Sequence, residues 1–372
     1  MKALSTRILW MALAMGTAFA QQKGPVMPPP DACGVHGDAE VICGTRSPED
    51  MEVTPDGKFL IVPQFVTSPG GPGVTSGLGG LYLFDPAAKK FSKLTATNEP
   101  LKDWGEAACP GPIGDQLAPH GTSLAKRSNG AWQLYVVNHG GRQSIEMFEL
   151  KQMGTAWSIV WHGCVPSAID YNDVAALADG GFIATYPTGI TAQEAAQAKG
   201  KDAKGKQPAA SPFSGAPTGF LVRWVPGKGQ SELPGTRSGY PNGVVATPDG
   251  KTAYFAVYGS KEARRYDLRE LKTTGTVKLD FMPDNLTWNK GDLLAAGIKG
   301  LNGECPVGSG QFCRQAFAVA AINSGKMTAK TVYDSDKKGN LIPGVSVAFR
   351  LGKDLYIGAF EGDRIVKVPF KD

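Results

Sequence analysis

The sequence predicts an all-β fold, a six-bladed β-propeller with a central calcium-binding channel, and three observations lead to it. Of the 372 residues, 48 are Gly and 27 are Pro, a number of turn formers that is typical of short strands joined by tight turns. Outside residues 192–203, no helical period of apolar residues persists. One hairpin pattern recurs six times, whereas a β-sandwich would not need the same hairpin six times.

Each copy of the repeat begins at a polar residue or Gly, runs through a short strand, turns where Gly stands near Asp, Asn or Lys, and ends in an apolar strand. The sequence Thr-Pro-Asp-Gly-Lys occurs in both the first and the fourth copy. The spacing of 42 to 71 residues is enough for a four-stranded blade with its loops. The copies start at residues 49, 120, 172, 242, 284 and 344.

The first twenty residues have the pattern of an export signal. Lys2 and Arg7 are basic, residues 8–15 are apolar, and residues 18–20 form a small-x-small cleavage site. The apolar run is too short to cross a bilayer, which takes about 20 residues. We therefore expect residues 1–20 to be a signal peptide and residues 21–372 to form a single propeller domain in the periplasm or outside the cell.

Six cysteines lie in the expected mature chain. In an oxidising compartment an even number indicates disulfides, with about 15 possible connectivities for six cysteines. The closeness of Cys305 and Cys313 predicts a local bridge between them, while the other pairings stay open. No CxxC or Cys/His spacing indicates a zinc site. The cysteines are Cys33, Cys43, Cys109, Cys164, Cys305 and Cys313.

The charge of the chain argues against a nucleic-acid-binding protein. Loss of Lys2 and Arg7 lowers the formal charge from +5 to +3, and a nucleic-acid binder would show a clustered basic face. The one basic cluster, at residues 199–206, lies in a low-complexity stretch without aromatic residues. Residues 191–217 are rich in Ala, Lys, Gln and Gly, a composition that predicts a mobile lid loop outside the blades.

Polar residues recur at the starts of the repeats. The first strand of each propeller blade lines the central channel and begins at one mouth, so these residues should converge on the axis. Alone, each is more typical of a turn, but four blades share the pattern. Carboxylate and amide oxygens are ligands of calcium, and Asn is a poor zinc ligand. The residues are Glu49, Asp50, His120, Asn172, Asp173, Asn242, Asp284 and Asn285.

Adjacent acidic or amide residues predict two ions at different depths. Neighbours along a strand face opposite sides, so Glu49 and Asp50 should not reach the same ion. The same holds for Asn172 and Asp173. Asp284 and Asn285 would both serve one ion only if the backbone there is irregular, and Pro283 before them is compatible with that.

As a set, these motifs resemble the paraoxonase/arylesterase family, within the gluconolactonase-like calcium-dependent six-bladed β-propellers. The matching stretches occur in order over most of the expected mature chain. They are residues 47–57, 119–123, 135–139, 172–177, 241–244, 284–285 and 347–370.

The resemblance implies a site with two calcium ions, one catalytic and one structural. The structural ion would be bound by Asp50, Asp173 and the backbone carbonyl of Thr122, and a His120–His139 pair would lie above the catalytic ion. The family opens lactones, and many members also cleave aryl esters or organophosphates. The implied ligands of the catalytic calcium are Glu49, Asn172, Asn242, Asp284 and Asn285.

The chain departs from the family's animal members in three respects. Its apolar N-terminal segment is expected to be cleaved, and it lacks a cysteine near the C-terminus that would close the propeller. The segment 191–217, which corresponds to an apolar active-site helix, is polar here. Lipoprotein or membrane association is therefore not expected, and the expected partner is a small-molecule lactone or ester.

The expected chemistry is hydrolysis by water that a histidine activates next to a metal-polarised carbonyl. No Gly-x-Ser-x-Gly motif is present, which argues against a serine esterase. Three alternatives stay open: a related hydrolase of sugar lactones or organophosphates, a non-catalytic binding propeller stabilised by calcium, and two purely structural histidines. The histidine pair favours a lactonase or arylesterase over a hydrolase of sugar lactones. His36 and His162 fit no such pattern and are expected to be structural.

Overall fold

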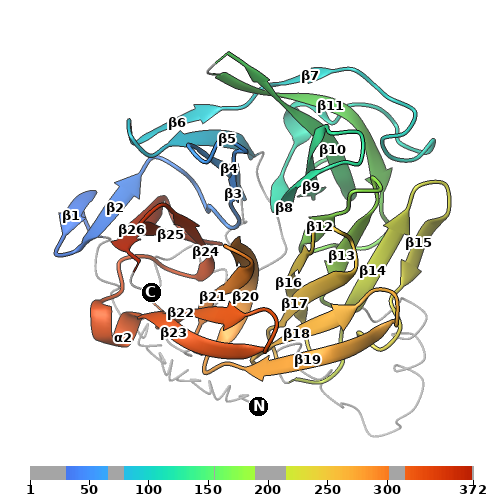
Figure 1. Ribbon diagram of the computed structural model, residues 1–372. Helices are drawn as coiled ribbons and strands as arrows, with labels where there is room; N and C mark the ends of the chain where they lie inside the picture. The colour runs from blue at the N-terminus through green and yellow to red at the C-terminus, as the bar shows by residue number, and fades with distance from the viewer. Residues whose placement is uncertain (1–30, 66–78, 155, 189–214, 301–314, 371–372) are drawn as a thin grey trace, which may run out of the picture.

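The computed structural model describes residues 31–65, 79–154, 156–188, 215–300 and 315–370. In this part of the chain, six sheets are arranged as blades around a central axis (Figure 1), which confirms the predicted six-bladed β-propeller. The expected signal peptide, most of the segment 191–217 and the pair Cys305 and Cys313 lie outside the described residues.

The first three blades follow the chain in order. Blade 1 consists of β3 (Glu52–Val53), β4 (Leu60–Gln64), β5 (Gly80–Asp85) and β6 (Lys90–Lys93). Blade 2 consists of β8 (Pro119–Lys126), β9 (Trp132–Asn138), β10 (Ser144–Met153) and β11 (Ala156–Pro166), with β7 (Ala96–Asn98) parallel to β11 at its outer edge. Blade 3 consists of β12 (Val174–Ala176), β13 (Phe182–Tyr186), β14 (Phe220–Val225) and β15 (Gly229–Glu232).

The last blade closes the ring with strands from both ends of the described chain. In blade 6, β2 (Ala39–Cys43) pairs with β26 (Arg364–Pro369), and Cys33 forms a disulfide with Cys43 across the hairpin of β1 (Gly34–His36) and β2. Blade 4 consists of β16 (Pro241–Ala246), β17 (Thr252–Val257), β18 (Glu262–Asp267) and β19 (Lys272–Lys278). Blade 5 consists of β20 (Met282–Asn289), β21 (Asp292–Ile298), β22 (Phe317–Asn323) and β23 (Thr328–Asp334), which α2 (Ser335–Lys338) follows. Blade 6 consists of β24 (Val345–Leu351), β25 (Asp354–Ala359), β26 (Arg364–Pro369), β2 (Ala39–Cys43) and β1 (Gly34–His36).

The six hairpins expected from the repeat are the first two strands of the six blades. The shared Thr-Pro-Asp-Gly-Lys sequence explains why copies one and four fold alike. Asp56 accepts hydrogen bonds from the Thr54 hydroxyl at 2.6 Å and the Lys58 amide at 3.2 Å, and Asp249 makes the equivalent bonds in blade 4. Gly57 has a φ of 70°, a left-handed value that Gly adopts without steric cost.

The hydrophobic core is divided into layers between neighbouring blades. One apolar cluster fills each of the six interfaces in the described part of the chain. Phe182 and Trp224, for example, stack between blades 2 and 3 with centroids 5.4 Å apart. Because the apolar side chains lie between the blades, the starts of the inner strands can present polar side chains to the axis.

A second disulfide, Cys109–Cys164, ties the segment 99–118 to β11. This segment contains η1 (Gly114–Gln116) and leads directly into β8, which bears His120. The long connection before His120 is thus anchored to the blade that it serves. No helix in the described ranges is long and apolar enough to span a membrane.

Candidate functional site

The inner strands of blades 2, 4, 5 and 6 are irregular at their starts. Their pairing registers shift between Pro119 and Thr122, between Pro241 and Val244, between Pro283 and Leu286, and between Val345 and Val347. Such bulges redirect side chains, and the irregular backbone expected after Pro283 is present. The residues within the shifts are His120, Gly121, Asn242, Gly243, Asp284, Asn285 and Ser346.

Two glycines allow neighbouring blades to approach closely at the axis. A Cβ on Gly121 would lie 2.3 Å from Oδ1 of Asp173, and a Cβ on Gly243 would lie 2.5 Å from Cα of Asn285. No side chain fits at such distances. The glycines after His120 and Asn242 therefore bring the start of each strand against the start of the next blade, where Asp173 and Asn285 lie.

The buried residues of the site form two levels along the axis. The first, called the upper level, comes from blades 1, 3, 4 and 5 and consists of Glu49, Asn172, Asn242, Asp284 and Asn285. The amide of Asn285 donates to Oε1 of Glu49 at 2.9 Å and to the Glu49 carbonyl at 3.0 Å. The amide of Asn242 is hydrogen-bonded to the Asp284 carboxylate. Ser346, from blade 6, also donates to the Glu49 carbonyl at 2.6 Å.

These donors leave a set of oxygens unpaired. Oε2 of Glu49 and the Oδ1 atoms of three asparagines are buried and have no hydrogen-bond partner within the described part of the chain. Buried polar atoms are nearly always hydrogen-bonded, so each exception requires an explanation such as a bound ion. The asparagines are Asn172, Asn242 and Asn285.

The electrostatics of the upper level are unfavourable without a cation. Burial raises the pKa of Glu49 well above its usual range, and Asp284 and Asp50 raise it further. Burial also raises the pKa of Asp284 well above its usual range. Among the described residues, no Lys or Arg forms an ion pair with either carboxylate, and Nε2 of His120 lies 3.7 Å from Oε1 of Glu49.

A lower level contains Asp50 and Asp173. Asp50 accepts hydrogen bonds from the Thr122 amide at 2.7 Å and hydroxyl at 2.8 Å, and Asp173 accepts from the Val244 amide at 2.6 Å. Thr122 and Val244 lie two residues beyond His120 and Asn242, so the aspartates lie further along the propeller axis than Glu49. Each aspartate thereby connects its own blade to the next one.

A third carboxylate, Glu52, accepts a hydrogen bond from the Leu124 amide at 2.9 Å near this level. Burial raises the pKa of Asp50 to about 6, and it raises the pKa values of Asp173 and Glu52 well above their usual range. The sequence analysis missed Glu52. The signal was its spacing of two from Asp50, which places both on one side of a strand.

The donor set fits calcium better than a transition metal. Within the described ranges, no three His, Cys, Asp or Glu side chains are placed to bind an ion by themselves. A site here must be completed by asparagine or backbone oxygens, which are ligands of hard cations such as Ca²⁺. Three of the four unpaired oxygens of the upper level are asparagine oxygens, and the fourth is the carboxylate oxygen of Glu49.

The two histidines contact each other, His120 near the start of β8 and His139 directly after the end of β9. Nδ1 of His120 lies 3.0 Å from Nε2 of His139, and Nδ1 of His139 lies 2.6 Å from Oε1 of Gln143. Phe65 stacks on the His120 ring at 4.3 Å. The His120 side chain keeps 13% exposure, so it remains partly accessible to solvent.

Burial holds both histidines neutral near pH 7. It lowers the pKa of His120 well below 6.5, and the neighbouring His139 lowers it further. Burial also lowers the pKa of His139, against the opposing effects of Gln143 and Asp170. His162 lies elsewhere and is hydrogen-bonded to Glu149 at 2.9 Å, as expected for a structural residue.

Sequence reasoning missed several residues of the mouth. Phe65 and Gln143 contact the histidine pair through tertiary packing for which the sequence holds no signal, whereas Ser346 lies at the start of the sixth repeat, which was a signal. Tyr240 also had a signal, because it stands two residues before Asn242. Burial, Asp284 and Glu49 raise the pKa of Tyr240, and its φ of 55° is unusual for a residue with a side chain.

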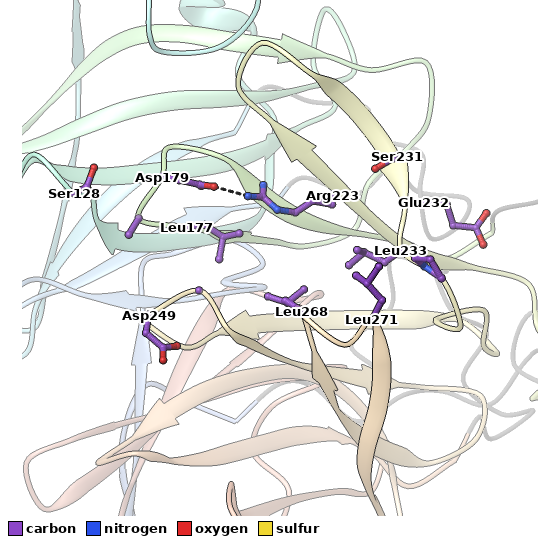
Figure 2. A pocket seen from close by; sticks show the side chains of 13 residues that line it. Ser128, Leu177, Asp179, Arg223, Ser231, Glu232, Leu233, Asp249, Leu268 and Leu271 are labelled. Atoms are coloured by element: carbon purple, nitrogen blue, oxygen red, sulfur yellow. Dashed lines mark hydrogen bonds and ion pairs between the residues drawn. The ribbon is translucent and has the colours of Figure 1, made fainter.

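A large surface cavity, of about 750 Å³, lies away from this site (Figure 2). It is lined by Asp179 and Asp249, which belong to turns at the ends of the inner strands of blades 3 and 4. The candidate site lies at the starts of these strands, on the opposite face. Asp179 is paired with Arg223 at 2.7 Å, and no group of the site lines this cavity.

No protein-family model and no curated protein sequence matches this chain. Similar solved structures include a luciferin-regenerating enzyme, with 14% identity, a TM-score of 0.48, and coverage of 89% of this chain and 94% of that one. Another is a gluconolactonase from Xanthomonas campestris, with 15% identity, a TM-score of 0.49, and coverage of 93% of this chain and 99% of that one. The assignment of the fold rests on the six sheets themselves.

Proposed function

We propose that this protein is an exported, calcium-dependent hydrolase that opens lactones and cleaves aryl esters. The observation that supports this most strongly is the set of four unpaired buried oxygens beside a neutral, accessible histidine. An ion-binding cluster and a base at one channel mouth are the two groups that metal-assisted ester hydrolysis requires.

The upper level would hold the catalytic ion. A calcium ion bound there supplies a Lewis acid for the carbonyl of the substrate. His120 accepts a proton from the attacking water at Nε2, and His139 stabilises the resulting imidazolium through Nδ1 of His120. His120 then returns the proton to the leaving alkoxide or phenoxide. The ligands would be Glu49, Asn172, Asn242, Asp284 and Asn285.

The lower level would hold a structural ion. Asp50, Asp173 and the backbone carbonyl of Thr122 would be its ligands, and the two carboxylates already connect blades 1 to 2 and 3 to 4. An ion between them would neutralise charges that burial otherwise makes costly. It would thereby stabilise the closed ring.

Export is supported by the cysteines. The described residues contain two disulfides and no free cysteine. Disulfides persist in oxidising compartments and are rare in the cytosol. Together with the expected signal at residues 1–20, this supports a periplasmic or secreted location.

We expect the purified mature chain to hydrolyse small lactones and aryl acetates in the presence of calcium. The hydrolysis should stop in excess chelator and resume when calcium is restored. The measurement is the initial rate over a panel that also includes a phosphotriester and a sugar lactone. Asn242→Ala should lose turnover, because Oδ1 of Asn242 is one of the unpaired oxygens.

The matched control for Asn242→Ala is Asn129→Ala. Asn129 lies in the turn between β8 and β9, at the opposite end of its blade, where its side chain accepts a hydrogen bond from the Ala131 amide. Turnover that is insensitive to chelation would refute the proposal. Binding of panel compounds without any hydrolysis would instead favour a calcium-stabilised binding propeller.

A further inference from the structure

We propose that Gln143 is a positioning residue that sets the tautomers of the histidine pair, so that Nε2 of His120 is the unprotonated nitrogen facing the calcium ligands. The catalytic consequence of this inference rests on the proposed function, whereas the tautomers themselves do not. The proposal follows from two consecutive hydrogen bonds, Gln143 to His139 and His139 to His120.

The direction of the first hydrogen bond fixes all the protons that follow. Oε1, the side-chain carbonyl oxygen of Gln143, can only accept a hydrogen bond, so Nδ1 of His139 bears the proton. In a neutral imidazole only one nitrogen is protonated, so Nε2 of His139 accepts, and Nδ1 of His120 donates to it. Nε2 of His120 is left with a lone pair, 3.7 Å from Oε1 of Glu49.

The opposite amide orientation would reverse every proton in the chain. A donating Gln143 would place the proton of His139 on Nε2, and His120 would then bear its proton on Nε2. That nitrogen would point an N–H at the calcium ligands and could not accept a proton from water. The orientation of one amide therefore decides whether His120 can act as a base.

The turn that contains Gln143 is held firmly. The Asn138 side chain donates to the backbone carbonyl of Arg142 at 2.8 Å and accepts a hydrogen bond from the Ala118 amide at 2.9 Å. The backbone carbonyl of Gln143 accepts a hydrogen bond from the Ser167 amide at 2.9 Å. A Cβ on Gly140 would lie 1.9 Å from the Gln116 carbonyl, so the turn packs tightly against the segment that leads to His120. Gln143 thus approaches His139 from a fixed backbone.

Nuclear magnetic resonance of protein with ¹⁵N-labelled histidine tests the inference directly. The chain has four histidines, so the ring signals can be assigned with His→Gln variants. In the wild-type protein we expect both His120 and His139 to be the Nδ1–H tautomer. Gln143→Glu, which can only accept, should keep both tautomers, whereas Gln143→Met, which cannot accept, should give mixed tautomers.

Kinetics supply the second readout. We expect Gln143→Met to lower kcat for lactones about 10–100-fold, by analogy with the effect of removing the hydrogen-bond partner of a metal-binding histidine, with little change in KM. Gln143→Glu should restore most of this loss. An Nε2–H tautomer of His120 in the wild-type protein, or unchanged tautomers and kcat in folded Gln143→Met, would overturn the inference. An inactive wild-type protein with the expected tautomers would refute the proposed function alone.

Discussion

Protein stripped of calcium is expected to lose all lactone and ester turnover and to melt roughly 5–10 °C or more below the calcium-loaded protein. An ion at about 1,000 times its dissociation constant stabilises the folded state by about 4 kcal/mol per site, and each kcal/mol shifts Tm by a few degrees. The physical reason is the set of buried carboxylates that have no Lys or Arg partner in the described part of the chain. They are Glu49, Asp50, Glu52, Asp173 and Asp284.

Variants should separate the two levels of the site. Asp50→Ala and Asp173→Ala remove both a proposed calcium ligand and a hydrogen bond between blades, so they should lower Tm strongly. Asn242→Ala should mainly abolish turnover, and Asn129→Ala should change neither quantity. Differential scanning calorimetry and initial rates measure the two effects. If chelated protein melts at the same temperature as calcium-loaded protein, the proposal of a structural ion at the lower level is wrong.

The pH dependence of the chelated protein supplies a further check on the same carboxylates. Burial raises the pKa of Asp50 to about 6, above its value in the unfolded chain of about 3.9. Between these values the folded state binds more protons than the unfolded state, so stability falls as pH rises. Chelated protein should therefore melt higher at about pH 5 than at about pH 7, and calcium should abolish or reverse this trend.

His120→Gln is expected to lower kcat/KM for lactones by roughly 10²–10⁴-fold, the usual contribution of a positioned base. Calcium affinity should be nearly unchanged, because the ligands of the upper level remain. Aryl esters with good leaving groups should lose less, since they need less assistance. The wild-type rate should rise with pH through a midpoint below 6.5, because burial lowers the pKa of His120 and only the neutral ring accepts a proton.

Two further histidine variants serve as comparisons. His139→Gln should cost less than His120→Gln, because His139 contacts His120 rather than the substrate. His36→Gln is the matched control, since His36 lies in β1 at the outer edge of blade 6. If His120→Gln retains wild-type lactone turnover, the base is another group and the catalytic part of the proposal fails, although the calcium sites could stand.

The propeller could be predicted from local chemistry, whereas parts of the site could not. Each hairpin turn is encoded within a few residues, as in the paired bonds of Asp56 and Asp249, so six copies were visible in the sequence. The starts of the inner strands were predictable because the fold brings them to one axis. The Cys109–Cys164 disulfide has a sequence separation of 55 and depends on how the loop packs, which the spacing of cysteines does not determine.

The contacts of Gln143 and Phe65 show the limit most clearly. Gln143 follows His139 by four residues through a glycine turn, and Phe65 reaches His120 from another blade. Neither position has a composition or period that distinguishes it from an ordinary loop residue. Their places depend on the exact path of two loops, which only tertiary packing sets.

Counting the calcium ions bound per chain tests the central claim most directly. Calcium titration calorimetry of chelated and dialysed protein, checked by elemental analysis, should give two ions per wild-type chain. A variant that combines Glu49→Gln with Asn242→Ala should bind one, because only the upper level is changed. No bound calcium in the wild-type chain, or two ions in the double variant, would contradict the placement of the catalytic ion at Glu49, Asn242 and their neighbours.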